Sequence, residues 1–321
     1  MSNDRDTPQK RVVKFIPTDE QRQMEIREWK EVTPELSALL QRLDDKSAAN
    51  AFTEKYGKKL QRLLLPPKSQ VLLFPETLRI KDLKNVDQFI YKYVYARKKY
   101  RVRKNQASLT KTEWLRFKGA INALRESGIE PPTYQEFVDI HVQAMTTHEG
   151  HMWGAHGGNN FLPWHREYLI EVENRMRLFN PLVTIPYWDW ANDPLPAELS
   201  DPQDLANWGI TRNSPIGPMP SQTQVTNVMA QTTWDGFRTS LEGIHNSVHN
   251  SVGGQMQTAS SPSDPIFWLH HGFIDKIWAD WQKLNPTKKP TNLSEQLQPP
   301  PIFQRTVGQV MNTASMGYKY L

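Results

Sequence analysis

The chain has 321 residues, of which 38% are hydrophobic and 11 are tryptophan, so it can bury a sizeable core. It carries a formal charge of +5 and no cysteine, which excludes disulfides, thiolate metal sites, iron–sulfur clusters and cysteine nucleophiles. Any metal ion must therefore bind through histidine or oxygen. No run approaches the ~20 apolar residues of a membrane span, and the opening segment lacks the apolar stretch of a secretory signal. We expect a cytoplasmic protein that binds no membrane, and export alongside a partner carrying the signal is left open.

The first part of the chain is basic and the rest is acidic. Up to Lys104 there are 24 Lys and Arg against 14 Asp and Glu, and after it 15 against 20. A basic front can bind nucleic acid or another anionic partner, but this one contains no recognised binding motif, which favours a solvated face or a linker. We therefore expect no nucleic-acid partner.

Residues 1–95 are predicted to form a helical N-terminal extension to which the sequence assigns no role. Apolar residues recur at helical spacing after Thr33, and proline then interrupts the pattern from Pro66 onward. Residues 96–321 are predicted to form the main domain.

The main domain is predicted to be mainly α, with few short strands. Helices are expected at 110–127, at 133–146, from Pro163 to about residue 179, at about 234–251, and from Asp264, as N-cap, onward. Residues 191–233 are rich in Pro, Asn, Ser and Thr and predict a long irregular segment. The expected architecture is a four-helix bundle with irregular loops.

All nine histidines lie between positions 141 and 271, and most fall on the expected helices. His245 and His249 are four residues apart, so their rings share one helix face, and His271 can approach from the next helix. His165 lies on the apolar face of its helix, with His156 before it and His141 on the preceding helix. Two histidine clusters without paired Glu-x-x-His motifs favour copper over iron, and helices that converge in this way can hold a dinuclear site.

A competing motif is HEGH at 148–151, which resembles part of the zinc protease signature. That signature needs its second histidine four residues after the first, where this chain has Met152. We interpret His148 and His151 as surface or supporting residues, and keep as an alternative that one of them is a ligand in place of His141.

Four segments resemble the signatures of tyrosinases, which are type 3 copper oxidases, and most closely the bacterial members. They are FLPWHREYL from Phe161, PYWDW from Pro186, LEGIHNSVHNSVGGQM from Leu241 and DPIFWLHHGFIDKIW from Asp264. The likeness covers about residues 100–320 and does not extend to residues 1–95. It implies two copper ions, each held by three histidines.

The resemblance assigns a role to each matching histidine. It makes His141, His156 and His165 the ligands of the first copper, and His245, His249 and His271 those of the second. His270 is then a pocket residue, because consecutive residues of a helix diverge by ~100°.

The resemblance also implies catalytic and pocket residues. Glu242 and Asn246 match the family pair that orients a water able to take the phenolic proton. Phe267, one turn before His271, is expected to face the metal site. The remaining substrate-pocket residues expected from the resemblance are His270, Asn250, Met256 and Ala259.

The activity that the resemblance implies is hydroxylation of monophenols and oxidation of ortho-diphenols to ortho-quinones by dioxygen. The alternatives are a catechol oxidase or ortho-aminophenol oxidase without monophenolase activity, and a haemocyanin-like oxygen carrier. The expected partners are a phenolic substrate and dioxygen, and a homo-oligomer is left open.

Overall fold

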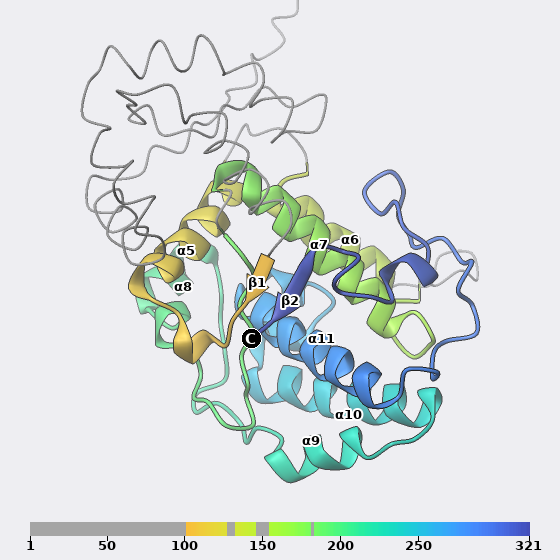
Figure 1. Ribbon diagram of the computed structural model, residues 1–321. Coiled ribbons are helices and arrows are strands. Elements are labelled where there is room, and N and C mark those ends of the chain that lie inside the picture. Colours follow the sequence, from red (N-terminus) through yellow and green to blue (C-terminus); the bar gives the residue numbers. More distant parts are fainter. Residues whose placement is uncertain (1–100, 127–131, 146–153, 181–182) are drawn as a thin grey trace, which may run out of the picture.

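The structure is a computed structural model that describes residues 101–126, 132–145, 154–180 and 183–321 (Figure 1). The predictions made for residues 1–95 lie outside the described residues. Within the described residues, no helix is both long and apolar enough to cross a membrane.

Five helices of twelve or more residues form the body of the described protein, and they bear out the predicted mainly α fold. Helices α7 and α11 pack against each other, α10 packs on both, and α5 packs on α6 and α7 (Figure 1). Their bounds are α5 Lys111–Arg125, α6 Tyr134–Met145, α7 Phe161–Phe179, α10 Trp234–Val252 and α11 Ile266–Leu284.

Local sequence signals explain where these helices begin. Thr110 and Glu113 form a capping box at the start of α5, as expected from Thr110. The N-cap residue of α11 is Pro265, one residue after the predicted Asp264. The Asp264 carboxylate nevertheless accepts the Ile266 N–H at 3.0 Å and so satisfies the first N–H of the helix. Helix α7 begins at Phe161, two residues before the predicted Pro163.

The prediction of a long irregular segment at 191–233 was wrong in part. This segment contains the 3-10 helix η3 (Ala197–Leu199) and two short helices, α8 (Pro202–Trp208) and α9 (Gln222–Met229). Asp201 caps α8, with Pro202 in its first turn, and Ser221 caps α9. The polar composition concealed these capping signals because each helix is only two turns long.

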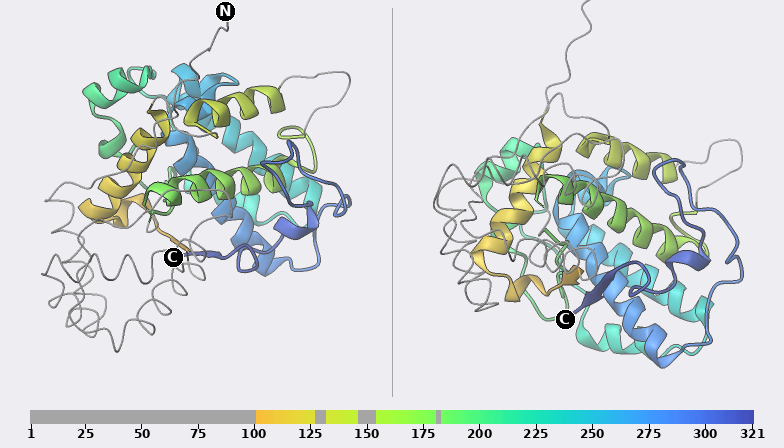
Figure 2. Two further views of the ribbon diagram at one scale, coloured as in Figure 1. Left: turned by 90° about the horizontal axis from the view of Figure 1, so that it is seen from above. Right: turned by 45° about the horizontal axis from the view of Figure 1, so that its top comes forward.

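Two three-residue strands close the described domain. Strand β1 (Arg101–Arg103) pairs in parallel with β2 (Tyr318–Tyr320), with Arg101 opposite Tyr318. Figure 2 shows orange β1 and dark blue β2 side by side next to the C-terminus. The remaining short elements are the 3-10 helices η2 (Gln106–Ser108), η4 (Gly254–Gln257), η5 (Ser261–Ser263) and η6 (Gly308–Val310).

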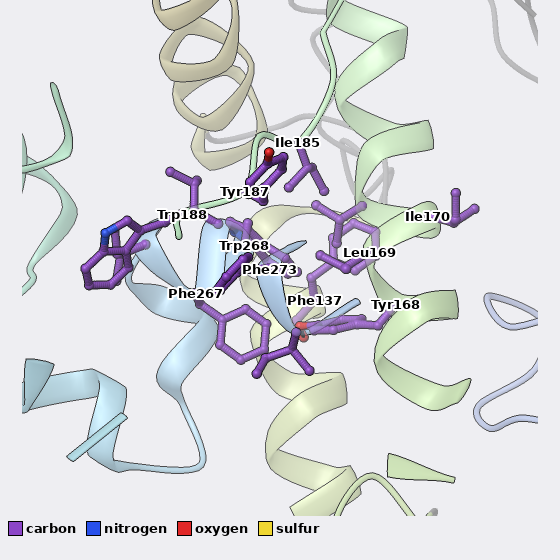
Figure 3. Packing of buried hydrophobic residues seen from close by; sticks show 14 of the residues in the cluster. Phe137, Tyr168, Leu169, Ile170, Ile185, Tyr187, Trp188, Phe267, Trp268 and Phe273 are labelled. Carbon is purple, nitrogen blue, oxygen red and sulfur yellow. Dashed lines mark hydrogen bonds between the residues drawn. The ribbon is translucent and has the colours of Figure 1, made fainter. Parts of the chain in front are cut away.

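Aromatic side chains fill the space between α6, α7 and α11 (Figure 3). The Tyr168 hydroxyl donates to the Phe137 carbonyl at 2.5 Å, and the Tyr168 and Trp268 rings lie 5.0 Å apart. These side chains are essentially inaccessible to solvent, so they fix the spacing of the three helices.

A buried charged cluster ties the strands to the bundle. The Asp275 carboxylate of α11 accepts from Arg166 Nε of α7 at 2.5 Å and from the Tyr318 hydroxyl of β2 at 2.6 Å. Arg103 of β1 lies 2.9 Å from Glu173 of α7 and 3.5 Å from Asp275. All four charged side chains are at most 4% exposed, so each depends on its partners to remain charged.

We predict that Asp275→Ala lowers the free energy of unfolding by about 3–5 kcal/mol, because it leaves the Arg166 guanidinium buried without its carboxylate. Urea unfolding followed by circular dichroism measures the loss. The matched control is Asp280→Ala on the same helix, where the carboxylate binds Lys276 and Lys283 near the surface and should contribute less than about 1 kcal/mol. Equal losses in the two variants would contradict the prediction.

Candidate metal centre

Three histidines form a first group in which one ring nitrogen of each lies within 4.8 Å of the others. His141 comes from α6, His165 from α7, and His156 from the segment between them. The Nε2 atoms of all three are shielded from solvent and have no hydrogen-bond partner among the described residues. A buried polar atom without a partner is costly, so three such nitrogens in one place indicate a site that can bind a metal ion.

A second group consists of His245 and His249 of α10 with His270 and His271 of α11. Three Nε2 atoms converge: those of His245 and His249 are 3.0 Å apart, His245 and His271 3.2 Å, and His249 and His271 3.4 Å. Nitrogens that each lie ~2.0 Å from one tetrahedral ion are themselves roughly 3.3 Å apart. This spacing therefore fits a metal ion bound by three imidazoles.

The opposite nitrogen of several rings donates to a nearby oxygen, which fixes the ring and leaves Nε2 as the lone-pair donor. These hydrogen bonds run from His141 Nδ1 to Ala259 O at 2.6 Å, from His165 Nδ1 to Phe161 O at 2.8 Å, from His249 Nδ1 to Met256 O at 2.6 Å, and from His245 Nδ1 to Asn246 Oδ1 at 3.0 Å. The two groups are thus prepared as neutral nitrogen ligands.

Burial favours the same neutral form. Desolvation lowers the pKa of His141 to about 3 and that of His249 to about 4. It also lowers the pKa of His165, His245 and His271 well below the usual value, and the neighbouring imidazoles lower these further. Neutral imidazole is the form that binds a metal, so the electrostatics and the tautomers agree.

The two groups adjoin each other. The His165 and His271 rings stack with centroids 4.2 Å apart, and the His156 and His245 rings lie 5.5 Å apart. Donor atoms that are all imidazole nitrogen fit copper.

Glu242 and Asn246 lie four residues apart on α10, beside this centre. Residue Glu242 is 9% exposed. Its carboxylate accepts the Gly157 N–H at 2.6 Å and lies 3.5 Å from His156 Nδ1. The Asn246 side chain is exposed, and its oxygen holds His245. The structure therefore places the predicted pair next to one histidine of each group.

The predicted pocket residues occupy different positions. The Phe267 ring is buried, 4.1 Å from the His271 ring and 5.2 Å from that of His141, so it lies against both groups. His270 is also buried, packs on His245 at 5.0 Å, and neither of its nitrogens has a partner among the described residues. Asn250 is exposed.

Met256 and Ala259 were expected as pocket side chains, but the contacts that connect them with the centre are main-chain ones. Their carbonyl oxygens accept from His249 and His141, respectively. Sequence reasoning missed this role, and that of the Phe161 carbonyl, because every residue has a carbonyl group and the side chain gives no sign of its use. His148 and His151 lie outside the described residues.

Comparisons with known proteins agree with this geometry. The model of the common central domain of tyrosinase matches residues 131–216 and 203–284. A tyrosinase of Streptomyces glaucescens is 36% identical over 234 residues, covering 58% of this chain and 84% of that protein.

Solved structures share the fold. A functional unit of octopus hemocyanin superposes with a TM-score of 0.58 at 25% identity, over 68% of this chain and 67% of its own. Latent apple tyrosinase superposes with a TM-score of 0.58 at 20% identity, over 70% and 63%. The helical arrangement is thus shared with these two structures.

We predict that the metal-free protein loses stability as the pH falls from about 6.5 toward about 4. His249 has a folded-state pKa of about 4, whereas unfolded histidine titrates near 6.5, so the unfolded state binds more protons between these values. The free energy of unfolding is measured with urea near pH 7.5 and near pH 5. Its decrease between the two pH values should be larger in the parent than in His249→Gln, by on the order of 1–2 kcal/mol. Equal losses would mean that His249 titrates normally in the folded protein.

Proposed function

This chain belongs to the tyrosinase family of type 3 copper oxidases, and on that premise we propose that it hydroxylates monophenols and oxidises ortho-diphenols to ortho-quinones with dioxygen. The observation that carries the proposal is the pair of adjoining histidine groups. The Nε2 atoms of His141, His156 and His165 have no hydrogen-bond partner among the described residues. Those of His245, His249 and His271 converge to within 3.0–3.4 Å of one another. A site with six nitrogen donors and no carboxylate ligand fits oxygen-activating copper better than the alternatives among divalent metals.

We assign His141, His156 and His165 to one copper ion, and His245, His249 and His271 to the other. Support for the second set is the 3.0–3.4 Å spacing of its three Nε2 atoms. When bound, the two ions supply the redox chemistry by which dioxygen is activated toward the phenol. The protein fixes the ligands, excludes water with an aromatic shell and handles the phenolic proton.

Glu242 and Asn246 are proposed to handle that proton. A free phenol has a pKa near 10, so at neutral pH its hydroxyl must lose a proton to a base or to a water held by one. The Glu242 carboxylate accepts the Gly157 N–H and lies 3.6 Å from Arg238 Nη1 and 3.5 Å from His156 Nδ1. Two carboxylate oxygens offer about four lone-pair sites, so one can still hold a water. The Asn246 amide lies one turn further along the same face of α10.

A haemocyanin-like oxygen carrier is the second candidate, favoured by the superposition on octopus hemocyanin. It ranks lower, because the Streptomyces protein that matches at 36% identity is a tyrosinase. Catalytic turnover separates the two functions, since a carrier binds dioxygen without forming quinone.

We predict that the full chain binds two equivalents of copper and then forms quinone from a monophenol and from a catechol. His249→Gln should bind about one equivalent tightly and form no quinone, because it removes one of three ligands from one ion. Elemental analysis and the quinone absorbance measure the two quantities. Reversible dioxygen binding without quinone would favour the carrier, and a parent protein that binds no copper would refute the proposal.

We predict that Glu242→Gln slows monophenol oxidation by about 10²-fold or more and slows catechol oxidation much less, because a general base contributes about this much when a proton must be removed. Initial rates on both substrates give the ratio, and copper content is measured alongside because Glu242 also holds Gly157. The matched control is Glu198→Gln, which removes an exposed carboxylate on η3. Parallel slowing on both substrates would assign Glu242 a structural role.

A further inference from the structure

One short loop supplies an orienting oxygen to each of the two histidine groups. The Met256 carbonyl accepts from His249 Nδ1 and the Ala259 carbonyl accepts from His141 Nδ1, both at 2.6 Å. The two carbonyls are three residues apart, whereas the histidines belong to different groups and different helices. A movement of this loop would therefore reach both groups at once.

The loop leaves α10 through two glycines with left-handed backbone. Gly253 has φ of 74° and Gly254 has φ of 56°, values that other residues rarely adopt. A Cβ on Gly254 would lie 1.8 Å from the Thr211 carbonyl oxygen, and one on Gly253 would lie 2.1 Å from Asn213 Oδ1. The loop thus turns sharply against residues 211–213.

Side-chain hydrogen bonds hold the loop in that position. Gln255 Oε1 accepts the Thr211 N–H at 2.8 Å, and Gln255 Nε2 donates to the Gly209 carbonyl at 3.0 Å. A main-chain hydrogen bond from the Asn213 N–H to the Val252 carbonyl, at 2.8 Å, joins the same segment to the end of α10. Among the described residues, the side-chain hydrogen bonds of Gln255 go to Thr211 and Gly209 and not to a histidine, so they act on the loop.

Beyond the loop, at Asp264, the chain is held by a second contact from residues 211–213. Arg212 forms a bidentate ion pair with Asp264, at 2.7 and 2.8 Å, and the two side chains are 5% and 0% exposed. Asp264 also accepts the Ile266 N–H at the start of α11, the helix that carries His271. Residues 211–213 therefore hold the chain on both sides of the loop, at Gln255 and at Asp264. A buried bidentate ion pair is among the stronger of such contacts.

We infer that residues 253–259 form a shared positioning loop, held by Gln255 and Arg212, that sets the orientation of one ligand of each copper ion. The inference rests on the proposed two-copper ligand set. Loss of a hydrogen-bond partner behind a ligand histidine typically weakens metal binding 10–100-fold. Because both partners lie on one loop, loosening it weakens the two copper affinities together.

The first test is an anaerobic titration of the metal-free full chain with Cu(I) against a competing chelator. Gln255→Ala should weaken both copper affinities by about ten-fold. Gln255→Glu keeps the acceptor for Thr211 but loses the donor to Gly209. Its copper affinities should therefore lie between those of Gln255→Ala and those of the parent. The matched control is Gln203→Ala, which removes an exposed side-chain hydrogen bond to Asn207 on α8 and should leave both affinities within about two-fold. Urea unfolding of each metal-free variant separates local from global effects.

The second test needs no copper. Proton NMR of the metal-free parent should show slowly exchanging Nδ1–H signals from His141 and His249. Both signals should broaden or shift in Gln255→Ala. The Nδ1–H signal of His165, whose partner is the Phe161 carbonyl, should stay in place. Weakening of one affinity alone, or signals of His141 and His249 that respond separately, would overturn the inference. A parent that binds no copper would refute the proposed function instead, and the NMR result would still decide the role of the loop.

Discussion

The centre depends on hydrogen bonds made by the nitrogens that do not face the metal. Where a ring donates Nδ1–H to an oxygen, as His141, His165, His245 and His249 do, its lone pair must lie on Nε2 and its plane is fixed. Without those oxygens the rings could rotate or exchange tautomers, and the 3.0–3.4 Å convergence at the second group would be lost. The helices bring the histidines together, and the oxygens decide which atom each presents.

Burying so many imidazoles without an ion is unfavourable, and the surrounding fold has to compensate. Unpartnered buried nitrogens cost free energy, and lowered pKa values reduce this cost by keeping the rings uncharged. The aromatic packing around Tyr168, Phe267 and Trp268 and the ion cluster at Asp275 join α7 to α11 through contacts that involve no histidine. A preformed site of this kind loses little conformational entropy when it binds its ligand.

The helices and the two histidine groups could be predicted from the sequence, because both depend on side-chain identity at regular spacing. Thr110 and Asp264 are recognisable signals for the start of a helix. His245 and His249 lie four residues apart, so they share one face of any α-helix that contains both. The roles of Met256 and Ala259 could not be predicted, since they act through carbonyl groups that all residues possess. The short helices α8 and α9 were missed because local capping at Asp201 and Ser221 competes with a composition typical of loops.

The segment at 191–233 shows why an apparently irregular region can matter to a helical metal site. Its residues 211–213 contribute no metal ligand and no hydrophobic core, yet they meet the end of α10 and the start of α11 through Asn213 and Arg212. A bundle fixes the spacing of its helices but leaves the loops at their ends free to differ, and here the carbonyls that orient His141 and His249 lie on such a loop. An element that clamps this loop therefore completes the geometry that the bundle alone leaves undetermined.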